Sequence, residues 1–438
     1  MMPSIDKIES DAALPRRAEV VVIGGGIIGV SAALYLAQKG VDVAVCEKGT
    51  VACEQSSRNW GWVRAMGRDL AEMPLCLESQ RLWAEMNTTC EAETGFRRCG
   101  VLYLCDTDRE MAAQQAWLDQ ARIYQITSRI VAPGELAEIL PAAKRKFAGA
   151  LMTPTDGRAE PQKAAPAIAA TARRHGAKIL ENCAVRGLDL AAGRVAGVVT
   201  EKGRIACDTV ILAGGAWSRL FCGNEGIDLP QLKMLSSVFA TTPMEGGPEV
   251  TVGGSDFAFR KRLDGGYSVA RRNGTISHIT PDSFRLFFDF FPSLIKGWNE
   301  VRLRVAGRFL EEWRIPRRWK LDASSPFEAV RVLDPAPDRP MLEEAKGKVA
   351  AAFPFFRDMK VAASWGGLID VTPDAVPVIS KVEAMPGLVI ATGFSGHGFG
   401  IGPGAGKLAA DLVTGATPIV DPTPFRLARF RRSVRVAR

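Results

Sequence analysis

The pattern of hydrophobic and polar residues near the start of the chain predicts a strand, a turn, a helix and a second strand. Residues 20–23 form an uninterrupted β-branched run, which is typical of a strand buried on both faces. After three glycines, an apolar-faced helix is expected over residues 27–39, with Gly40 as its terminator. A second strand is expected over residues 41–45, so the chain opens with a βαβ unit.

Glycines in the turn of this unit indicate what it binds. Gly24, Gly26 and Gly29 follow the spacing G-x-G-x-x-G, which gives a tight turn, bare backbone beside a pyrophosphate and close helix-to-strand packing. Glu47 lies 18 residues beyond Gly29, near the offset at which an acid accepts hydrogen bonds from an adenosine ribose. The glycines and the absence of flanking anchors disfavour a membrane span over residues 20–36. The unit therefore predicts an adenine dinucleotide, either NAD or FAD.

The middle of the chain alternates between helical and extended patterns. Helical periodicity predicts helices at residues 75–90, 108–123 and 161–172. Strands are expected at residues 100–104 and 209–212, and the second of these runs into a glycine turn that contains Gly214. This turn predicts a second backbone segment close to the nucleotide.

The later part of the chain changes character twice. Residues 233–268 read as short β-rich pieces with glycine turns, which predicts a separate sheet domain. Residues 276–320 are aromatic and basic, and predict two or three amphipathic helices that either pack on their own domain or form a lid or a membrane-facing surface. A buried strand at 387–393, a glycine-rich loop and a helix at 403–414 then restore the α/β pattern.

The length of 438 residues allows two or three domains. We expect an α/β plus β fold, in which a discontinuous Rossmann-like nucleotide-binding domain is interrupted by an antiparallel-sheet substrate domain with a helical, aromatic-rich insertion. The predicted ranges are 15–85, 145–230 and 356–425 for the nucleotide-binding domain, 86–144 and 231–355 for the substrate domain with its insertion at 276–320, and 426–438 for a basic tail.

Composition excludes several classes of protein. The net charge of +8 depends largely on six arginines in the last thirteen residues, so the body is nearly neutral and no nucleic-acid partner is expected. The tail either stays solvated or contacts anionic lipid or a partner. Nine scattered cysteines without C-x-x-C predict reduced thiols and a cytoplasmic location, and three isolated histidines make a metal site improbable. The N-terminus has no secretory or anchor pattern.

The segment at residues 49–68 is polar, rich in glycine and not periodic, so we expect a loop over the strand ends. Ser56, Ser57, Arg58 and Asn59 are able to donate hydrogen bonds to phosphate or to the edges of a flat cofactor. The two tryptophans that follow need a large flat surface to be buried.

Together these motifs resemble the D-amino-acid oxidase family of FAD-dependent amine oxidoreductases, and within it the bacterial L-amino-acid deaminase and amino-acid dehydrogenase branch. The resemblance covers almost the whole chain. It is carried by the first glycine turn with Glu47, by the Ser56-Ser57-Arg58 loop, by Ala213-Gly214-Gly215-Ala216-Trp217-Ser218, by Thr372-Pro373-Asp374, and by Gly393-Phe394-Ser395-Gly396-His397-Gly398. Ser325-Pro326-Phe327-Glu328 is one of the segments shared with the deaminases.

The resemblance implies a glutathione-reductase-like domain that binds FAD. The implied cofactor-binding residues are Gly24, Gly26, Ile27, Ile28, Gly29, Glu47, Lys48, Ser56, Ser57, Arg58, Val185, Gly214, Trp217, Gly367, Gly396, His397, Gly398, Phe399 and Gly400. Relatives with covalent flavin carry a cysteine at the place of Gly367, so noncovalent FAD is expected. The helix expected after the last glycine loop would direct its N-terminal dipole toward the flavin.

Substrate recognition is expected from the inserted sheet. A buried α-carboxylate requires a cation, and the arginine fork is a natural partner. The family carries such an arginine after a Gly-Tyr pair, which corresponds to Arg272 after Gly266-Tyr267. Arg272, Tyr267, Trp62 and Asp370 are the implied catalytic group, without a general base. Ile369 and Asp370 stand where many relatives have Arg-Pro, which disfavours a glycine-oxidase substrate set.

The implied reaction is oxidative deamination of an amino acid or an N-substituted or cyclic amino acid, by hydride transfer to the flavin and hydrolysis of the imine to a 2-oxo acid. Oxygen or a quinone would accept the electrons. The alternative is a flavoprotein subunit of a larger amine dehydrogenase complex, and peripheral contact with the inner membrane is a further expectation for residues 276–320 or the tail. Without a second G-x-G-x-x-G, a pyridine-nucleotide-dependent flavin reductase is disfavoured.

Overall fold

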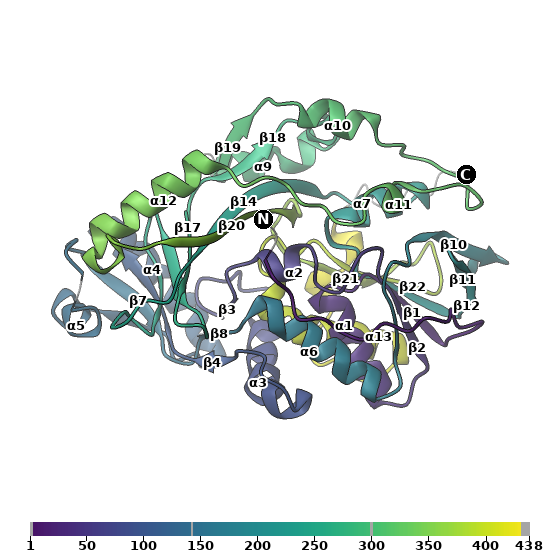
Figure 1. Cartoon of the computed structure of the whole chain (residues 1–438), viewed down its shortest axis with the longest axis horizontal. Coiled ribbons are helices and arrows are strands. Elements are labelled where there is room, and N and C mark those ends of the chain that lie inside the picture. Colours follow the sequence, from purple (N-terminus) through teal and green to yellow (C-terminus); the bar gives the residue numbers. More distant parts are fainter. Residues whose placement is uncertain (1–2, 142, 298–300, 431–438) are drawn as a thin grey trace.

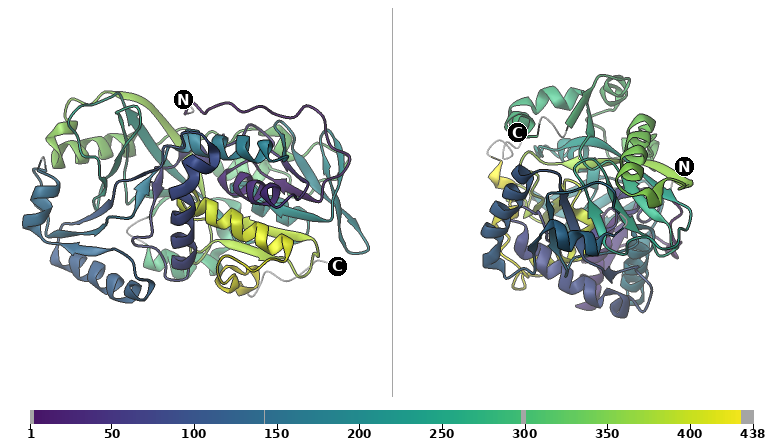
Figure 2. Two further views of the ribbon diagram at one scale, coloured as in Figure 1. Left: turned by 90° about the horizontal axis from the view of Figure 1, so that it is seen from below. Right: turned by 90° about the vertical axis from the view of Figure 1, so that its left-hand side faces the viewer.

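The computed structural model describes residues 3–141, 143–297 and 301–430. Two units lie side by side along the long axis, one built on a six-stranded sheet and the other on a ten-stranded sheet (Figure 1). In the view from below, the N-terminal segment follows the outside of the six-stranded unit (Figure 2). It is fixed there by backbone hydrogen bonds from Asp6 to Gln162 and from Asp11 to Ile179.

The six-stranded sheet has the order β21-β22-β13-β1-β2-β9, and only β21 runs antiparallel to its neighbour. The strands β1 and β2 are entirely buried, as expected for parallel strands covered on both faces. The bounds are β1 (Val20–Ile23), β2 (Val43–Cys46), β9 (Lys178–Leu180), β13 (Thr209–Leu212), β21 (Val378–Lys381) and β22 (Leu388–Thr392).

Helices cover one face of this sheet and a smaller sheet covers the other. The helices α1 (Ile27–Gln38), α6 (Pro161–Arg174) and α13 (Gly398–Thr414) share one apolar core with β1, and α3 (Met73–Cys90) packs against α13. The opposite face packs on an antiparallel three-stranded sheet of β10 (Val185–Ala191), β11 (Arg194–Thr200) and β12 (Gly203–Ala206). This unit therefore has three layers.

The ten-stranded sheet has the order β19-β18-β14-β17-β16-β15-β5-β7-β6, with β20 paired to β14. We expected an antiparallel sheet, but the pairs β5–β15 and β18–β19 are parallel, so the sheet is mixed. The strand β5 precedes β15 by well over a hundred residues, and no hairpin fixes their relative direction. The bounds are β5 (Val101–Cys105), β6 (Arg129–Val131), β7 (Gly149–Thr153), β14 (Leu232–Thr241), β15 (Thr251–Gly253), β16 (Ala258–Lys261), β17 (Tyr267–Ala270), β18 (Thr275–His278), β19 (Val301–Arg304) and β20 (Val361–Val371).

Strand pairing moves two of the predicted domain boundaries. The strands β7 and β20 belong to the ten-stranded sheet, although both fall in ranges predicted for the nucleotide-binding domain. The chain therefore changes from one sheet to the other after these strands, later than residues 145 and 356. Each strand was assigned to the wrong side because a short buried strand has the same sequence pattern in either sheet.

Helices also cover the ten-stranded sheet. The helix α12 (Arg339–Ala352) packs across one face, as Figure 1 shows, and its Leu342 and Val349 share a core with Phe239 and Val269. The other helices of this unit include α4 (Asp108–Ala121) and α5 (Pro133–Ile139), whereas α11 (Pro326–Ala329) packs its Phe327 in the core of the six-stranded unit. A small sheet of β3 (Trp62–Val63), β8 (Gly157–Arg158) and β4 (Arg97–Arg98) lies between the two units.

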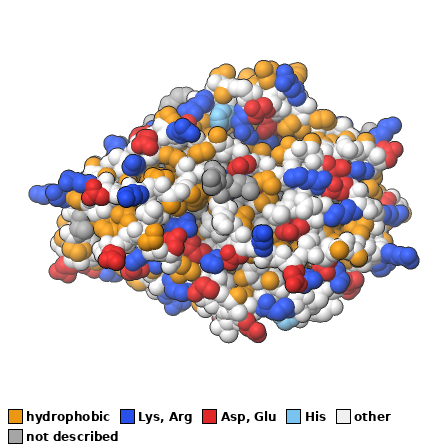
Figure 3. All heavy atoms as spheres, in the orientation of Figure 1, with side chains coloured by type: hydrophobic (Ala, Val, Ile, Leu, Met, Phe, Trp, Pro, Cys, Tyr) orange, Lys and Arg blue, Asp and Glu red, His pale blue; other side chains and the backbone are white. Residues whose placement is uncertain are grey.

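The aromatic segment at residues 276–320 contains α8 (Pro281–Arg285), α9 (Phe287–Lys296) and α10 (Arg308–Arg314). It also contributes β19 and most of β18 to the sheet edge, which the amphipathic pattern did not predict. Its apolar side chains are exposed, including Phe284, Ile295 and Trp313, and hydrophobic and basic side chains meet at the top of Figure 3. No helix within the described ranges is both long and apolar enough to cross a bilayer.

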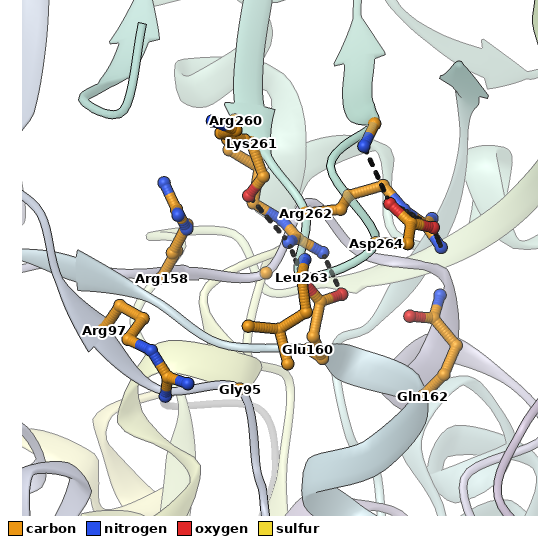
Figure 4. A network of polar contacts seen from close by, with 12 residues as sticks. Gly95, Arg97, Arg158, Glu160, Gln162, Arg260, Lys261, Arg262, Leu263 and Asp264 are labelled. Carbon is orange, nitrogen blue, oxygen red and sulfur yellow. Dashed lines mark hydrogen bonds and ion pairs between the residues drawn. The ribbon is translucent and has the colours of Figure 1, made fainter. Parts of the chain in front are cut away.

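The two units are joined by a buried ion pair between Arg260 in β16 and Glu160 at the start of α6 (Figure 4). Of the predicted basic tail, residues 431–438 lie outside the described part. Arg429, inside it, pairs with Asp374 at 2.7 Å. All nine cysteines are free thiols.

Candidate functional site

A cavity of about 520 Å³ lies between the two units. Its walls include the turns after β1 and β13, the short helix α2 (Gln55–Arg58), the loop before α13, and parts of β14 and β20. Open α/β sheets usually bind ligands at the carboxyl ends of their parallel strands, and this cavity has that position. The same cavity reaches the predicted nucleotide turn and the predicted substrate sheet.

The first glycine turn forms one end of the cavity. Gly24 has φ +110°, and a Cβ there would lie 2.4 Å from the carbonyl oxygen of Ala213, so only glycine allows the turns after β1 and β13 to meet. Gly26 begins α1 without a side-chain cap, and Ser56 Oγ accepts a hydrogen bond from the Ile27 amide at 2.9 Å. Gly24, Gly26, Ile27, Ile28 and Ser56 all line the cavity.

Two predicted binding residues lie behind the wall instead. A Cβ at Gly29 would lie 2.0 Å from the carbonyl oxygen of Gly24, so this glycine allows α1 to pack against the turn. Ser57 is fully buried, and its hydroxyl donates to the Glu54 carbonyl. Neither residue lines the cavity, so both support the wall and do not contact a ligand directly.

Glu47 lines the cavity at the end of β2. Its carboxylate accepts hydrogen bonds from the Gly25 amide at 2.7 Å and from the Gly49 amide at 2.8 Å. Burial raises the pKa of Glu47, although these two amide donors act in the opposite direction. The carboxylate therefore fixes the loop beside the glycine turn and still faces the cavity.

Lys48, Trp217 and Val185 complete this end of the wall. Lys48 Nζ forms an ion pair with Glu54 at 2.7 Å and lies 4.6 Å from the centre of the Trp217 ring. Trp217 Nε1 donates to the same carboxylate at 3.1 Å. The wall here is a flat aromatic surface held by a polar network, which suits a planar base.

Arg58 connects α2 to the ten-stranded sheet. Only 4% of its surface is exposed, and its guanidinium donates to the carbonyl oxygens of Cys53 and Gly366 and to Asp334. A Cβ at Gly367 would lie 3.3 Å from the Cβ of Arg58, which makes the contact close. Arg58 and Gly367 line the cavity, but the donors of Arg58 are already engaged by the protein.

The loop before α13 forms the opposite part of the wall through Gly396, His397, Gly398, Phe399 and Gly400. The expected helix start at residue 403 is wrong, because α13 begins at Gly398. Its glycines suggested a loop, yet they allow close packing. A Cβ at Gly400 would lie 2.9 Å from the carbonyl oxygen of Trp62. The helix N-terminus, with its positive dipole end, thus lies directly at the cavity.

Beside this helix start, His397 pairs with a buried acid that the sequence did not single out. His397 Nδ1 lies 3.1 Å from Glu72 Oε2, and Glu72 is fully buried. Burial, and next the charge of Arg68, lowers the pKa of His397, so the imidazole is neutral at neutral pH. Because a carboxylate only accepts, Nδ1 carries the proton and donates to Glu72.

Asp370, a predicted catalytic residue, lines the cavity but is 2% exposed. Its Oδ2 accepts hydrogen bonds from Gln231, Thr392 and the Gly393 amide at 2.8 to 3.2 Å. Burial raises the pKa of Asp370 to about 6. These bonds hold the end of β22 against β20, so the carboxylate positions the loop before α13.

Arg272 lies at the far end of the cavity, where the ten-stranded sheet supplies the wall. Its guanidinium carbon lies 3.7 Å from the centre of the Tyr103 ring, and Nη1 donates to the Gly254 carbonyl at 3.1 Å. Trp62 also lines this end and packs on Tyr103 at 6.2 Å between ring centres. The predicted arginine and tryptophan are thus brought together.

Tyr267, the fourth predicted catalytic residue, does not line the cavity. Its side chain is fully buried under α12, its ring packs on Phe259 and Phe356, and its hydroxyl donates to the Pro248 carbonyl at 3.1 Å. Arg272 lies beyond the end of β17, so the strand position of Tyr267 does not determine where Arg272 points. Tyr267 therefore belongs to the core of the ten-stranded unit.

Several lining residues were missed by the sequence analysis, among them Tyr103, Arg64 and Arg68. Tyr103 occupies a predicted strand whose partner was not known, because pairing across the sheet is not encoded locally. The arginines belong to a loop segment without periodicity, and charged loop residues usually indicate a solvated surface. The spacing of two arginines four apart within an aromatic loop is the one available signal.

The donor set fits the expected dinucleotide. The turns at Gly24 and Gly214 and the start of α13 present backbone to the cavity, which leaves room for a ligand to approach closely. The flat Trp217 surface and the helix N-termini suit a base and a pyrophosphate. No group of side chains suited to a metal ion occurs among the described residues.

Comparisons with known proteins agree with this geometry. A family model described as "FAD dependent oxidoreductase" (DAO) matches residues 19–412. The solved structure of L-amino acid deaminase from Proteus myxofaciens, in complex with anthranilate, superposes with a TM-score of 0.94 at 35% identity and covers 98% of this chain and 97% of that chain.

Two curated relatives match almost the whole chain at lower identity. Glycine oxidase of Pseudomonas putida is 28% identical over 415 residues, which is 93% of this chain and 97% of the relative. The 4-methylaminobutanoate oxidase (formaldehyde-forming) of Paenarthrobacter nicotinovorans is 26% identical over 424 residues. This chain spans 46% of the length of that oxidase, or about half.

Proposed function

The chain belongs to the DAO family of FAD-dependent oxidoreductases, and from this premise we propose that it oxidises the carbon–nitrogen bond of an amino acid with FAD bound noncovalently in the cavity. The reaction proposed is oxidative deamination of an amino acid, or of an N-substituted or cyclic amino acid, to a 2-oxo acid. The family match confirms the resemblance inferred from the motifs. The substrate and the chemical steps are the proposal.

One observation carries the proposal. A continuous cavity joins the glycine turn after β1, the N-terminus of α13 and the guanidinium of Arg272. A dinucleotide along the six-stranded unit and a carboxylate on Arg272 would therefore share one cavity. The complex of the Proteus myxofaciens deaminase with anthranilate, itself an amine-bearing carboxylate, supports a ligand of this chemistry.

Each part of the wall has a proposed role. The Gly24 and Gly214 turns and Glu47 would hold the adenosine and pyrophosphate of FAD, and the start of α13 would face the flavin. Position 367 is glycine, which offers no side chain for a covalent link. The six-stranded unit would thus be the FAD-binding domain, and the ten-stranded unit the substrate domain.

FAD, when bound, supplies the acceptor for a hydride. The protein would supply binding and orientation. Arg272 would pair with the α-carboxylate, and the aromatic side chains Trp60, Trp62 and Tyr103 would exclude water from that end of the cavity. The lining acids Glu47, Glu54 and Asp370 are all engaged by other protein groups, so we assign no general base.

Arg272 offers the sharpest test. Replacement by Met removes the guanidinium and keeps the length of the side chain, and replacement by Lys keeps the charge but not the fork. We expect Arg272→Met to keep FAD and to lose kcat/KM for amino acids by at least 100-fold, an effect of about 3 kcal/mol for a desolvated charge pair. The assay follows 2-oxo acid and ammonia. An unchanged kcat/KM in Arg272→Met would contradict the proposed role.

The second candidate function is that of a flavoprotein subunit in a larger dehydrogenase complex. The observation in its favour is the exposed apolar face of α8, α9 and α10, with Phe284 67% and Trp313 65% exposed. Peripheral contact with a membrane is a separate prediction for the same surface. Oxygen or a quinone as electron acceptor, and a cytoplasmic location, are also predictions. Gel filtration of the protein expressed alone, followed by an activity assay, separates the two functions, because a subunit would be inert without its partner.

A further inference from the structure

Arg68 is the cavity residue whose environment the proposed function does not explain. It lines the cavity, yet only 4% of its surface is exposed. Its Nε and Nη1 donors are buried and have no hydrogen-bond partner. Among the described residues, no carboxylate lies within ion-pair distance of its guanidinium. Buried arginines are almost always paired, because an unpaired buried charge costs several kcal/mol.

The backbone of Arg68 is fixed, so this placement is not that of a loose surface side chain. Its carbonyl oxygen accepts a hydrogen bond from Trp117 Nε1 at 2.9 Å, and its amide donates to the Ala65 carbonyl at 3.2 Å. Burial, and next the charge of Arg64, lowers the pKa of Arg68 to about 10. The guanidinium therefore remains charged at neutral pH, with its Nε and Nη1 donors unpartnered.

Arg68 belongs to a group of three arginines around Tyr103. The guanidinium carbons of Arg272 and Arg64 lie 3.7 and 5.2 Å from the centre of the Tyr103 ring, so they are at most 8.9 Å apart. Gly67 precedes Arg68 in the loop that also carries Arg64. A Cβ on Gly67 would lie 2.9 Å from Tyr103 and 3.5 Å from Arg64 Nη1, so this loop packs closely on the tyrosine. All three arginines line the same end of the cavity.

The acids near this end leave the group with an excess of positive charge. Glu72 does not line the cavity; it accepts a hydrogen bond from the neutral His397, and its charge offsets part of the charge of Arg68 and Arg64. The acids that do line it are Glu47, Glu54 and Asp370, and each is bound to groups elsewhere in the wall. Three arginines thus line one end of the cavity. The α-carboxylate of a substrate would pair with only one of them, so the other two would remain without an anionic partner.

We propose that Arg68, together with Arg64, binds a second anionic group of the substrate, so that the substrate is an amino acid with a second carboxylate, either in its side chain or on its nitrogen. This inference rests on the proposed function. Arg272 would hold the α-carboxylate, and the unused donors of Arg68 would bind the other one in a bidentate manner. The guanidinium carbons of Arg64 and Arg272 are at most 8.9 Å apart, which is compatible with a short dicarboxylate.

The test compares matched substrates that differ only in this charge. We would measure kcat/KM of the purified holoenzyme for aspartate against asparagine and glutamate against glutamine, in both enantiomers, and for iminodiacetate against its monoamide, with an artificial electron acceptor. The expected result is a preference of about 100-fold for the acid in at least one pair, as for a desolvated charge pair. Equal or better turnover of the amides would overturn the inference and leave the proposed function intact.

Variants assign the effect to Arg68. Arg68→Gln should reduce the acid-to-amide ratio below about 10-fold, because kcat/KM for the acid should fall much more than kcat/KM for the amide. Arg271→Gln is the matched control, because Arg271 pairs with Glu344 and does not line the cavity. If Arg68→Gln instead loses FAD and keeps the ratio, the arginine serves the cofactor and the inference is wrong.

Two further outcomes are separated by the same panel. If Arg68→Gln does not fold, the acid-to-amide ratio of kcat/KM in the wild type tests the inference. A second test is a titration of the wild-type flavin absorption with succinate and with its monoamide, in which succinate should bind at least 10-fold more tightly. If no amino acid is turned over or bleaches the flavin while dithionite does, the proposed function itself is refuted, and the inference with it.

Discussion

The ion pair between Arg260 and Glu160 permits a prediction whose size follows from the structure. Arg260 Nη1 and Nη2 donate to the two carboxylate oxygens of Glu160 at 2.7 and 3.0 Å, a fork arrangement visible in Figure 4. The side chains are 1% and 7% exposed. Arg260 Nε also donates to the Trp60 carbonyl, in the loop that lines the cavity, so the pair connects both units to the site.

Replacement of Arg260 by Met keeps most of the side-chain volume and leaves Glu160 buried without its cation. Removal of one partner from a buried pair costs about 3–5 kcal/mol of unfolding free energy. The double variant Arg260→Met with Glu160→Gln should recover part of this loss, since no buried charge remains. Arg97→Met is the control, because Arg97 and Glu93 are more than 40% exposed and their pair contributes about 0–1 kcal/mol.

Urea unfolding of the four proteins at several pH values is the assay. Burial raises the pKa of Glu160, but the charge and hydrogen bonds of Arg260 outweigh it and hold the pKa below 4.5. The wild-type pair thus stabilises the protein above pH 4.5, and this contribution is lost as the pH falls through the folded pKa. In Arg260→Met burial is opposed only by the Leu263 amide and the charge of Arg262, so the variant should regain stability as the pH falls from 7 toward 5. A loss no larger than that of Arg97→Met would refute the reasoning.

Three other changes have definite outcomes. Gly29→Ala places a Cβ 2.0 Å from a backbone oxygen of the glycine turn and should abolish FAD retention, whereas Gly347→Ala, at an open helix position, should keep the flavin absorption of the wild type. Asp370→Asn should remove a pH dependence of the free energy of unfolding, measured by urea unfolding. Because the pKa of Asp370 is about 6 in the folded state and 3.8 in the unfolded state, the wild type loses up to about 3 kcal/mol of this free energy as the pH rises from 4 to 7. Replacement of Phe284 and Trp313 by Ser should reduce binding to anionic vesicles in a sedimentation assay, without lowering Tm, and unchanged binding would exclude this face as the contact.

The sequence predicted the parts of the fold whose signal is local. The βαβ unit around Gly24 and the strand at Thr209–Leu212 were found because buried parallel strands are continuous apolar runs and glycines occupy the turns between them. Pairing between distant segments has no local signal. The assignment of Gly149–Thr153 and Val361–Val371 to the ten-stranded sheet therefore required the structure.

The candidate site divides in the same way. Glycines such as Gly26 were identified from spacing, and Arg272 from its place after a Gly-Tyr pair, and both line the cavity. Tyr267 was wrongly grouped with Arg272, because the sequence did not show which face of the sheet it occupies. Arg68 was missed because its burial depends on packing against elements remote in the chain.

The central claim is that the cavity holds FAD beside an amino acid. The measurement that tests it most directly is anaerobic titration of the purified protein with a panel of amino acids, followed by the flavin absorption band. We expect a yellow protein with one FAD per chain, released on denaturation, whose band bleaches with at least one amino acid. A colourless protein that takes up no FAD, or a flavin that only dithionite reduces, would contradict it.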